Sequence, residues 1–303
     1  MICKGLLEGA TDVTVAQRLQ TMWLPLEQPL DLESTLESGQ AFRWRRTGAW
    51  WNGVLEGHVV ELRERPGGLQ YRSSLSIPQG MDVALSRYFR LDDDLPAIQR
   101  SLSQDPEVAR AIADYPGLRL LRQEPWECLV SFICSSNSNI PRIRGIIERM
   151  ARSFGRPVGL GRRRRFTFPS PEALAEAGEK RLAKLRLGYR AAYVARTARI
   201  VAEGRLSLLA LREAGYQEAK DALLELPGVG EKVADCVLLF SLEKLEAFPV
   251  DVWVRRALEE RYLGGEKRPP KALAAWARDR FGRHGGYVQQ YLFHRRRSEA
   301  LRG

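Results

Sequence analysis

Cysteine is scarce in this sequence. The 303 residues include four cysteines, at positions 3, 128, 134 and 236, and no two of them form a Cys-x-x-Cys pair. Structural zinc sites and iron–sulfur clusters need closely spaced cysteine ligands, so this spacing argues against both. Scattered, unpaired cysteines are typical of proteins that work in a reducing compartment. We expect no metal and no organic cofactor.

Long apolar runs are also missing. No stretch is long and apolar enough to be a membrane-spanning helix, which needs about 18 such residues. The N-terminal residues lack the sustained apolar core of a signal peptide, and internal repeats and low-complexity linkers are absent. A chain of this length allows one large domain or a few modest ones, each able to bury a core.

Acidic residues are outnumbered by basic ones. Lys and Arg total 48 against 37 Asp and Glu, which gives a net charge of +11 and a pI near 9.8. A surplus of positive charge suits a polyanionic partner such as nucleic acid. Ribosomal, membrane-surface and merely basic proteins share this property, so charge alone leaves the partner open.

The residues from Leu30 to about Ser76 have the pattern of short β-strands. Four segments rich in aromatic and β-branched residues are separated by turns that contain Gly or Pro: Ala41–Arg45, Ala49–Glu56, His58–Glu64 and Leu69–Arg72. We predict a twisted antiparallel sheet in which Trp44, Trp50 and Trp51 are packed.

From Asp82 onward the pattern becomes helical. The predicted helices are Glu107–Asp114, Trp126–Ser135, Ile140–Phe154, Pro171–Ala177, Glu179–Leu185, Ala191–Glu203, Leu206–Ala214, Val252–Arg261, Pro269–Phe281 and Gly286–Arg296. The arginine run Arg162–Arg165 favours a solvated loop, with direct phosphate contact as the alternative. The predicted fold class is α+β, with an N-terminal antiparallel β domain and flanking helices over residues 1–118 and a mostly α-helical region over residues 119–303.

One stretch organises the helical region. An apolar segment ending at Leu226 is interrupted by Pro227-Gly228-Val229-Gly230, and a second apolar run, Val233–Leu242, follows at once. Helix, tight Gly-x-Gly turn, helix is the simplest interpretation, and we assign this helix-hairpin-helix to residues 220–251. The unpaired N–H groups of such a turn and the dipole of the second helix make a seat for a phosphate. Gly228, Val229 and Gly230 are the predicted phosphate-binding residues.

Lys232 and Asp251 are the chemically reactive groups beside this hairpin. Lys232 stands at the start of the second, apolar helix, and Asp251 follows Pro249-Val250. Desolvation and the positive end of a helix dipole both disfavour an ammonium ion, and a neutral amine is a nucleophile. A fixed carboxylate stabilises positive charge that develops during a reaction. Taken singly, a surface lysine and a helix cap are the ordinary interpretations of these residues.

Four segments, in this order, resemble the helix-hairpin-helix–Gly/Pro/Asp DNA glycosylase superfamily, and within it the 8-oxoguanine DNA glycosylase/lyase family. They are Ser38-Gly39-Gln40-Ala41-Phe42-Arg43-Trp44, Ser131–Ile140, Leu187-Gly188-Tyr189-Arg190, and the hairpin segment Leu226–Cys236 with Pro249-Val250-Asp251. The similarity extends from about Leu30 to Phe293. A Gly-x-Gly hairpin alone would be weak evidence, because many DNA-binding proteins use it without catalysis.

The resemblance implies a bifunctional DNA glycosylase/AP lyase of base excision repair that flips 8-oxoguanine out of duplex DNA and excises it. Lys232 is implied as the nucleophile that attacks C1′ and forms a Schiff base, after which β-elimination nicks the strand. Asp251 is implied to stabilise the oxocarbenium-like charge at C1′. The implied partner is double-stranded DNA with 8-oxoguanine opposite cytosine, bound by a monomer.

The resemblance also implies a set of DNA contacts. Asn137, Arg142 and Arg190 are expected near the orphaned cytosine, because arginine and asparagine carry donors that suit its acceptors. Tyr189 is expected to wedge beside that base by stacking. The Gly228–Gly230 turn is expected to hold the DNA backbone.

Recognition of 8-oxoguanine depends on one proton, because its N7 carries a hydrogen where guanine has a lone pair. The resemblance assigns the accepting backbone carbonyl to Gly39, whose ordinary interpretation is a turn. Gln289 offers a donor and an acceptor to the Watson–Crick edge, and Phe293 shares its helical face and can cover the base. Cys236 shares a face with Lys232 and could pack on the other side, although a buried cysteine is more often plain core.

Two residues depart from the family pattern. Eukaryotic members usually carry histidine two residues after the catalytic aspartate, where this chain has Trp253. An acidic residue three positions after the base-stacking phenylalanine is replaced by Arg296. We hypothesise that phosphate contact near the lesion is rebuilt with Arg296 or its neighbours, and opposite-base selectivity stays open.

Two alternatives stand beside this interpretation. A related glycosylase for another damaged base is disfavoured because monofunctional relatives lack the lysine, and adenine- or pyrimidine-specific relatives usually carry a four-cysteine cluster. A non-catalytic helix-hairpin-helix DNA-binding protein is disfavoured by the presence of both Lys232 and Asp251. We expect the cytoplasm, on nucleoid DNA, in a prokaryote and the nucleus in a eukaryote.

Overall fold

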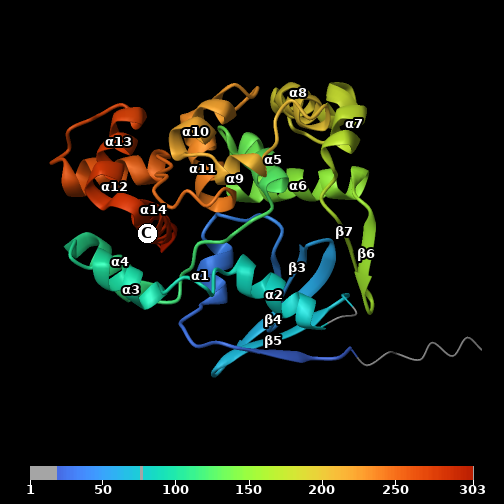
Figure 1. Cartoon of the computed structure of the whole chain (residues 1–303), viewed down its shortest axis with the longest axis horizontal. Helices are drawn as coiled ribbons and strands as arrows, with labels where there is room; N and C mark the ends of the chain where they lie inside the picture. The colour runs from blue at the N-terminus through green and yellow to red at the C-terminus, as the bar shows by residue number, and fades with distance from the viewer. Residues whose placement is uncertain (1–18, 76–77, 303) are drawn as a thin grey trace, which may run out of the picture.

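The N-terminal part of the chain folds into the antiparallel sheet that its short apolar segments predict (Figure 1). The computed structural model describes residues 19–75 and 78–302. Its larger sheet has the strand order β1-β5-β4-β3-β2. The strands are β1 (Met22–Pro25), β2 (Arg45–Thr47), β3 (Trp50–Leu55), β4 (His58–Arg65) and β5 (Gly68–Ser73).

One face of this sheet forms a core with helix α2 (Pro78–Tyr88). Trp51 lies opposite Leu62, which lies opposite Tyr71, and all three are buried. Directly opposed residues of antiparallel strands point to the same side, so the register places them on one face. Met81 and Leu85 of α2 complete this smaller of the two hydrophobic cores.

The strand prediction is confirmed for three segments and wrong for Ala41–Arg45, of which only Arg45 enters a strand. Trp44 is buried in an irregular segment, where its Nε1 donates to the Tyr88 hydroxyl at 2.8 Å. A Cβ at Gly53 would lie 2.6 Å from the Trp44 ring, so this indole packs on the sheet rather than within it. The apolar pattern therefore indicated burial correctly and strand pairing incorrectly.

Trp50 departs from the predicted packing. Trp44 and Trp51 are buried as expected, but Trp50 is only partly buried and lies on the opposite face of the sheet. The guanidinium carbons of Arg63 and Arg72 lie 4.4 and 4.3 Å from its ring centroid. These cation–π contacts take the place of an apolar core around this indole.

Most helices after residue 124 form the upper layer in Figure 1, and the earlier helices lie lower, near the sheet. Besides α2 the helices are α1 (Leu32–Glu37), α3 (Leu95–Leu102), α4 (Pro106–Asp114), α5 (Pro125–Ser135), α6 (Ile140–Phe154), α7 (Pro171–Ala183), α8 (Arg190–Ala202), α9 (Ala210–Glu213), α10 (Tyr216–Leu224), α11 (Glu231–Ser241), α12 (Val252–Tyr262), α13 (Pro270–Phe281), the 3₁₀ turn η1 (Gly282–His284) and α14 (Gly285–Arg302). Several start at a side-chain cap followed by proline, as at Asp105 and Ser170, which explains why their starts could be predicted.

Helix α5 lies at the centre of the larger core. From Pro125 to Cys134 every side chain except that of Glu127 is buried, because α6, α8 and α11 all pack against it. A helix that is apolar on all sides must be enclosed in this way. Its last residue, Ser135, reaches the cavity described below.

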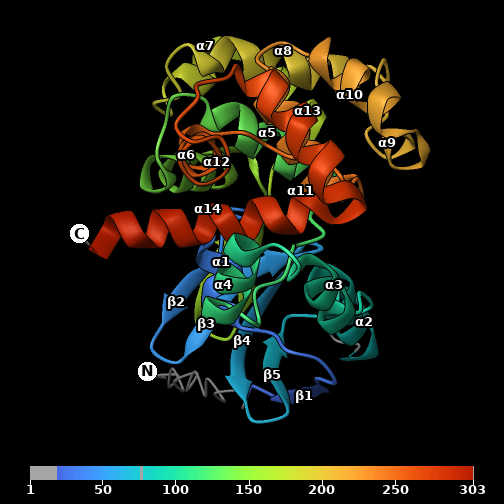
Figure 2. The same cartoon turned by 90° about the vertical axis from the view of Figure 1, so that its left-hand side faces the viewer.

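Helix α14 runs between the helical layer and the sheet (Figure 2). It packs against α4, α12 and α13. The Gln290 amide donates to the Ser38 carbonyl at 2.9 Å, and Arg297 Nη1 donates to the Glu37 carbonyl at 2.8 Å. The C-terminal helix therefore fixes the loop after α1 relative to the helical layer.

The described chain lacks two features that would indicate other functions. No helix in residues 19–75 and 78–302 is long and apolar enough to cross a membrane. No group of three or more His, Cys, Asp or Glu side chains in those residues is placed to hold a metal ion.

The arginine run was predicted to be a solvated loop, and this prediction is wrong. Residues Pro157–Leu160 (β6) and Arg163–Phe166 (β7) form a hairpin on the sheet. Arg165 is buried and donates to Asn52 Oδ1 at 2.7 Å and to the Arg43 carbonyl at 2.8 Å. The prediction failed because two guanidinium groups of this run meet acceptors on β3 and β4. No local sequence pattern reveals such distant partners.

Two helix predictions also need correction. Leu206–Ala214 is mostly irregular, and only Ala210–Glu213 is helical. The segments Pro171–Ala177 and Glu179–Leu185 belong to one assigned helix, α7, which is kinked between them at Gly178, where φ is +63°. The predicted break is therefore present as a kink that glycine permits.

The buried Arg165 gives a stability test. Burial lowers its pKa to about 10, and its guanidinium also lies 3.6 Å from the half-buried Glu148 carboxylate. We expect Arg165→Met to lower the free energy of unfolding by about 2–4 kcal/mol, because Asn52 loses its donor and Glu148 loses its ion-pair partner. Urea denaturation measures the change. Arg164→Met, at the exposed neighbouring position, should change it by less than about 0.5 kcal/mol, and equal losses would contradict the assignment.

Candidate active site

The Leu226–Gly230 turn joins α10 to α11 as the sequence predicts. The Val229 N–H donates to the Leu226 carbonyl at 3.1 Å, and Gly228 has φ +83°. A Cβ at Gly228 would lie 2.7 Å from the Cβ of Tyr193 on α8. Both the left-handed backbone and the close approach of α8 therefore require glycine at this position.

The start of α11 leaves backbone donors open. Gly230 is the N-cap residue and makes no side-chain cap hydrogen bond. In the part of the chain that the structure describes, no acceptor meets the N–H groups of Gly228 or Gly230. Open N–H groups and the positive end of a helix dipole favour an anion, whereas Val229 is buried and offers only its backbone.

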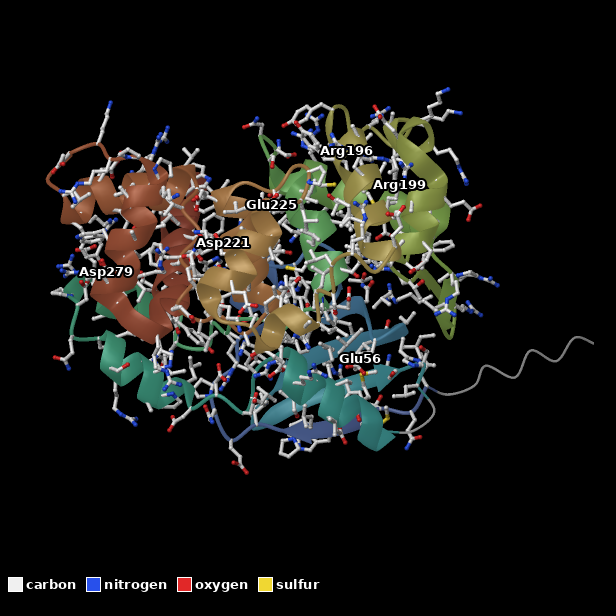
Figure 3. The ribbon with its side chains drawn as sticks, turned by 45° about the horizontal axis from the view of Figure 1, so that its top comes forward. Glu56, Arg196, Arg199, Asp221, Glu225 and Asp279 are labelled. Carbon is white, nitrogen blue, oxygen red and sulfur yellow. The ribbon has the colours of Figure 1, made fainter. Side chains whose placement is uncertain are left out.

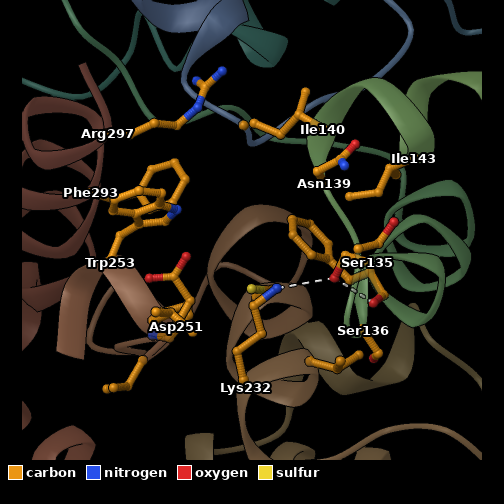
Figure 4. A pocket seen from close by; sticks show the side chains of 18 of the residues that line it. Ser135, Ser136, Asn139, Ile140, Ile143, Lys232, Asp251, Trp253, Phe293 and Arg297 are labelled. Atoms are coloured by element: carbon orange, nitrogen blue, oxygen red, sulfur yellow. Dashed lines mark hydrogen bonds between the residues drawn. The ribbon is translucent and has the colours of Figure 1, made fainter. Parts of the chain in front are cut away.

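A cavity of about 840 Å³ opens beside this hairpin. It brings together residues from the loop after α1, from the end of α5, from α11, from the start of α12 and from α14: Gly39, Ser135, Lys232, Asp251, Gln289 and Phe293. Figure 4 shows the Lys232 amine and the Asp251 carboxylate on facing sides of this space. The two reactive groups singled out in the sequence therefore share one cavity.

Lys232 is half-buried at the cavity wall. Its Nζ donates to Ser135 Oγ at 3.1 Å and lies 5.0 Å from the centroid of the Phe132 ring. Both contacts come from the last turn of α5. The amine is therefore held at a defined place instead of moving freely in solvent.

Asp251 is both a helix cap and a cavity residue. Its Oδ1 accepts the Val254 N–H at 2.8 Å, which caps α12 as predicted. Burial raises the pKa of the Asp251 carboxyl, and the Val254 N–H and the nearby Lys232 oppose that rise. The cap keeps the carboxylate oriented toward the cavity in surroundings that disfavour its charge.

Gly39 adopts a left-handed conformation with φ +81° on the cavity wall. A Cβ there would lie 3.1 Å from the Phe293 ring and 3.2 Å from Ile140, so only glycine fits without displacement. The buried side chains of Ser38 and Gln40 hold the loop, since the Gln40 amide donates to the Arg119 carbonyl at 2.8 Å. The backbone of Gly39 is therefore rigidly presented.

Gln289 carries an acceptor without a partner. It is buried, lines the cavity, and its Oε1 has no hydrogen-bond partner among the described residues. Phe293 lies one turn further along α14 on the same cavity wall. A buried unpaired acceptor is costly, so this atom indicates a place where a ligand donor binds.

Cys236 lies one helical turn after Lys232 and lines the same cavity. Burial raises the pKa of its thiol to about 12, and Lys232 in hydrogen-bond contact opposes that rise. The thiol is thus neutral in the ordinary pH range, and it supplies a small apolar surface beside the amine.

Asn137 and Tyr189 lie together at the mouth of the site. Asn137 is exposed with φ +49°, and its amide lies 3.4 Å from the Tyr189 hydroxyl. The Tyr189 side chain is 52% exposed, which leaves one ring available for stacking. These two predicted positions are brought together.

Arg190, which is predicted to lie near the orphaned cytosine, makes contacts within the protein. It is buried, and its guanidinium donates to the backbone carbonyls of Ser136, Asn137 and Leu187. Because its donors are engaged, Arg190 supports the loop that carries Asn137. The sequence could not distinguish a base-reading arginine from one that holds a loop.

Arg142 is exposed in the first turn of α6, and no ion pair is recorded for it among the described residues. Figure 3 shows charged side chains of both signs on the helical layer, with Arg196 and Arg199 on α8 and Asp221 and Glu225 near α10.

The cavity also contains residues that the sequence analysis missed as functional. Ser135 and Phe132 touch Lys232, and Trp253 and Arg297 line the wall near Phe293 (Figure 4). Ser135 stands three residues after Phe132, so helical spacing gave a signal once one of them was known to face Lys232.

Arg296 is engaged elsewhere. It pairs with Glu260 at 2.8 Å and with Glu299 at 3.6 Å. The hypothesis that Arg296 or its neighbours contact phosphate stays untested, and of these residues Arg297 is the one that lines the cavity.

Two family models match adjacent parts of the chain. The model for the N-terminal domain of 8-oxoguanine DNA glycosylase matches residues 24–129. The model for HhH-GPD superfamily base excision DNA repair proteins matches residues 130–281. Together they span the sheet, the helical layer and most of the cavity.

Individual proteins are similar over nearly the whole chain. An N-glycosylase/DNA lyase of Arabidopsis thaliana is 36% identical and is covered over 79% of its length by 89% of this chain. A probable N-glycosylase/DNA lyase of Methanothermobacter thermautotrophicus is 34% identical, with 89% of this chain and 95% of that protein covered.

A solved structure shows the same fold. The Clostridium acetobutylicum 8-oxoguanine glycosylase/lyase, in complex with double-stranded DNA containing cytosine opposite 8-oxoguanine, is 30% identical with a TM-score of 0.86. The match covers 92% of this chain and 98% of that one. The structure of MBOgg1 with a low-affinity DNA ligand is 37% identical, with a TM-score of 0.89 and coverage of 92% and 96%.

The raised pKa of Asp251 predicts a pH-dependent effect on stability. Because the folded pKa is above the unfolded value, the stabilising contribution is complete at low pH and is lost as the pH rises through the folded pKa. Asp251→Asn keeps the cap acceptor and removes the charge. We expect it to be more stable than the parent by about 1 kcal/mol at pH 7, with a smaller gain at pH 4.

Thermal unfolding at the two pH values measures this difference. Asp94→Asn is the matched control, because Asp94 caps α3 by accepting the Ala97 N–H at 2.9 Å but is exposed. It should change stability by less than about 0.5 kcal/mol, since Asp and Asn are comparable caps. A gain for Asp251→Asn that does not grow with pH would show that burial of the charge is not its cause.

Proposed function

Because the chain belongs to the 8-oxoguanine DNA glycosylase family of the HhH-GPD superfamily, we propose that its cavity is the active site, with Lys232 as nucleophile and Asp251 as the stabilising carboxylate. The protein is an N-glycosylase/DNA lyase of base excision repair that excises 8-oxoguanine. The observation that supports the site most is the presence of Lys232 and Asp251 on facing walls of one cavity beside an open helix N-terminus.

The proposed reaction begins when the Lys232 amine forms a bond to C1′ of the flipped nucleotide. The bond from C1′ to the base nitrogen breaks, and its electron pair leaves with the base. Asp251 faces the positive charge that develops at C1′. Loss of a proton from the amine and opening of the sugar ring give the Schiff base, and removal of a C2′ proton then expels the 3′ phosphate.

Selection of the base is assigned to four cavity residues. Gln289 Oε1, which lacks a partner, accepts a hydrogen bond from an N–H on the Watson–Crick edge of the base. The rigidly held Gly39 backbone offers a carbonyl to N7–H, which 8-oxoguanine has and guanine lacks. Phe293 covers one face of the base, and the neutral Cys236 packs beside it.

The DNA partner is duplex DNA with 8-oxoguanine opposite cytosine, bound by a monomer. Gly228 and Gly230 hold a phosphate through their open backbone N–H groups, and Val229, whose N–H donates to the Leu226 carbonyl, closes the turn between them. Tyr189 fills the space left by the flipped base, and Asn137 and Arg142 meet the orphaned cytosine. Arg190 acts indirectly by holding the loop that carries Asn137.

Reductive trapping tests the nucleophile. We expect sodium borohydride to link the protein covalently to an 8-oxoguanine:cytosine duplex, because it reduces a Schiff base to a stable amine. Lys232→Gln should give no adduct on gel electrophoresis. Lys271→Gln is the control, since Lys271 is exposed and pairs with Glu231, and it should trap as the parent does. An adduct formed by Lys232→Gln would disprove the assignment.

Selectivity for the opposite base tests the proposed contact between Arg142 and the orphaned cytosine. We expect Arg142→Ala to lower the ratio of excision rates opposite cytosine and opposite adenine about tenfold, since a good base contact contributes about 1–3 kcal/mol of discrimination. Single-turnover excision from the two duplexes gives the ratio. Arg164→Ala, another exposed arginine, should leave it within about twofold. An unchanged ratio in Arg142→Ala would remove Arg142 from the cytosine contact.

A further inference from the structure

We propose that Ser135 is a positioning residue that orients the Lys232 amine for attack, an inference that rests on the proposed role of Lys232 as the nucleophile. Lys232 Nζ lies 3.1 Å from Ser135 Oγ. Figure 4 shows this hydrogen bond on the side of the cavity that faces Asp251. The contact joins the last residue of α5 to the first turn of α11, far apart in the sequence.

A second contact of Ser135 fixes the direction of this hydrogen bond. Ser135 Oγ lies 2.7 Å from the Phe132 carbonyl oxygen. A carbonyl oxygen only accepts, so the single proton of the hydroxyl points toward it. Oγ then presents only lone pairs to Lys232, and the amine must be the donor.

This polarity determines where the lone pair of a neutral lysine amine points. Such an amine has two N–H bonds and one lone pair in a roughly tetrahedral arrangement. One N–H is directed at Ser135, and Cys236 lies one helical turn after Lys232 on the same cavity wall. The lone pair then occupies one of the two remaining directions and can face the open cavity, where C1′ of the substrate is placed by the proposed function. Ser135 thus limits rotation about the Cε–Nζ bond and aims the lone pair.

Ser135 Oγ can keep its hydrogen bond to the nitrogen of Lys232 as the reaction proceeds. A protonated Schiff base retains one N–H on the lysine nitrogen and carries positive charge. A lone pair of Ser135 Oγ can accept that N–H throughout, and a hydrogen bond to a charged donor is stronger than one to a neutral donor. The contact therefore stabilises the later, charged species more than the free amine, which is the property that accelerates a step.

The fold gives Ser135 a fixed position. It ends a helix that is enclosed on nearly every side, and the centroid of the Phe132 ring in the same turn lies 5.0 Å from Lys232 Nζ. Phe132 also stacks on Phe240 of α11 with ring centroids 5.5 Å apart. The acceptor and the nucleophile are consequently held by two helices that pack directly against each other.

Ser135→Ala tests the proposal. At saturating 8-oxoguanine:cytosine duplex, we expect the rate of borohydride trapping to fall roughly tenfold to a hundredfold, because the oriented, charge-assisted hydrogen bond is lost. Affinity for a duplex that carries a tetrahydrofuran abasic analogue should stay within about twofold, since this analogue cannot form the Schiff base. Ser135→Thr, which keeps a hydroxyl, should recover most of the trapping rate.

A matched control separates orientation from helix stability. Ser101 makes the same local contact at the end of α3, with Oγ 2.7 Å from the Ile98 carbonyl, and it is exposed away from the cavity residues. Ser101→Ala should trap at the parental rate. If Ser135→Ala loses analogue binding, Ser135→Cys replaces it in the comparison, because cysteine keeps the volume and is a weak acceptor. Ser135→Cys should then show the slow trapping.

The outcomes distinguish the role of Ser135 from the proposed role of Lys232 as the nucleophile. Trapping by Lys232→Gln would overturn the nucleophile itself. If the parent traps and Lys232→Gln does not, while Ser135→Ala or Ser135→Cys traps at the parental rate, the nucleophile stays in place and the role of Ser135 is overturned. Slow trapping by both Ser135→Ala and Ser135→Thr would also overturn it, because the hydroxyl would not be the group that matters.

Discussion

The packing of α11 against α5 is the constraint on which the site depends. Every residue of α11 from Val233 to Ser241 is buried, and Lys232 is the last residue before that run. Close-packed helices move little relative to each other, so the first turn of α11 is fixed where it leaves the core. The lysine side chain can then cross from apolar packing to the cavity, with its amine against the end of α5.

Polar contacts beneath the hairpin fix its two helices. Lys220 of α10 is buried and lies 3.0 Å from Asp235 and 2.8 Å from Glu231 of α11. The Tyr216 hydroxyl donates to Asp235 at 2.8 Å. Burial raises the pKa of Asp235, while the adjacent Lys220 opposes that rise. A buried ion pair is a weak source of net stability, but it tolerates few geometries, so its effect here is to fix the register of the two helices.

The sequence predicted what local pattern encodes, and it failed where a tertiary partner decides. The hairpin, Lys232 and Asp251 are encoded locally, because Gly-x-Gly and Pro-Val-Asp impose backbone shape on the residues that follow. Arg165 is different, since its guanidinium finds an acceptor on a segment distant in the sequence. A run of charge shows no such partner, so it was interpreted as a solvated loop, with phosphate contact as the alternative.

The resemblance to a known family added residues to the predicted site that physical reasoning from the sequence alone would not have selected. Gly39 and Gln289 look like a turn and a helix residue until the fold brings both to one cavity. Ser135 lay inside a quoted motif without being singled out, because the contact that gives it meaning crosses from α5 to α11. The helices and strands of the site were therefore easier to predict from the sequence than the contacts between them.

The groups that define the site are those that lack a hydrogen-bond partner or a favourable environment for their charge in the free protein. Gln289 Oε1 lacks a donor, the N–H groups of Gly228 and Gly230 lack acceptors among the described residues, and burial disfavours the charge of Asp251. The buried, unpaired Gln289 oxygen and the buried charge of Asp251 cost stability in the free protein. A ligand with an N–H edge, a phosphate and a developing positive charge satisfies all of them together. The enclosed α5–α11 core and the anchoring of α14 on the loop after α1 offset that cost, which is why the reactive residues project from the most rigid elements of the chain.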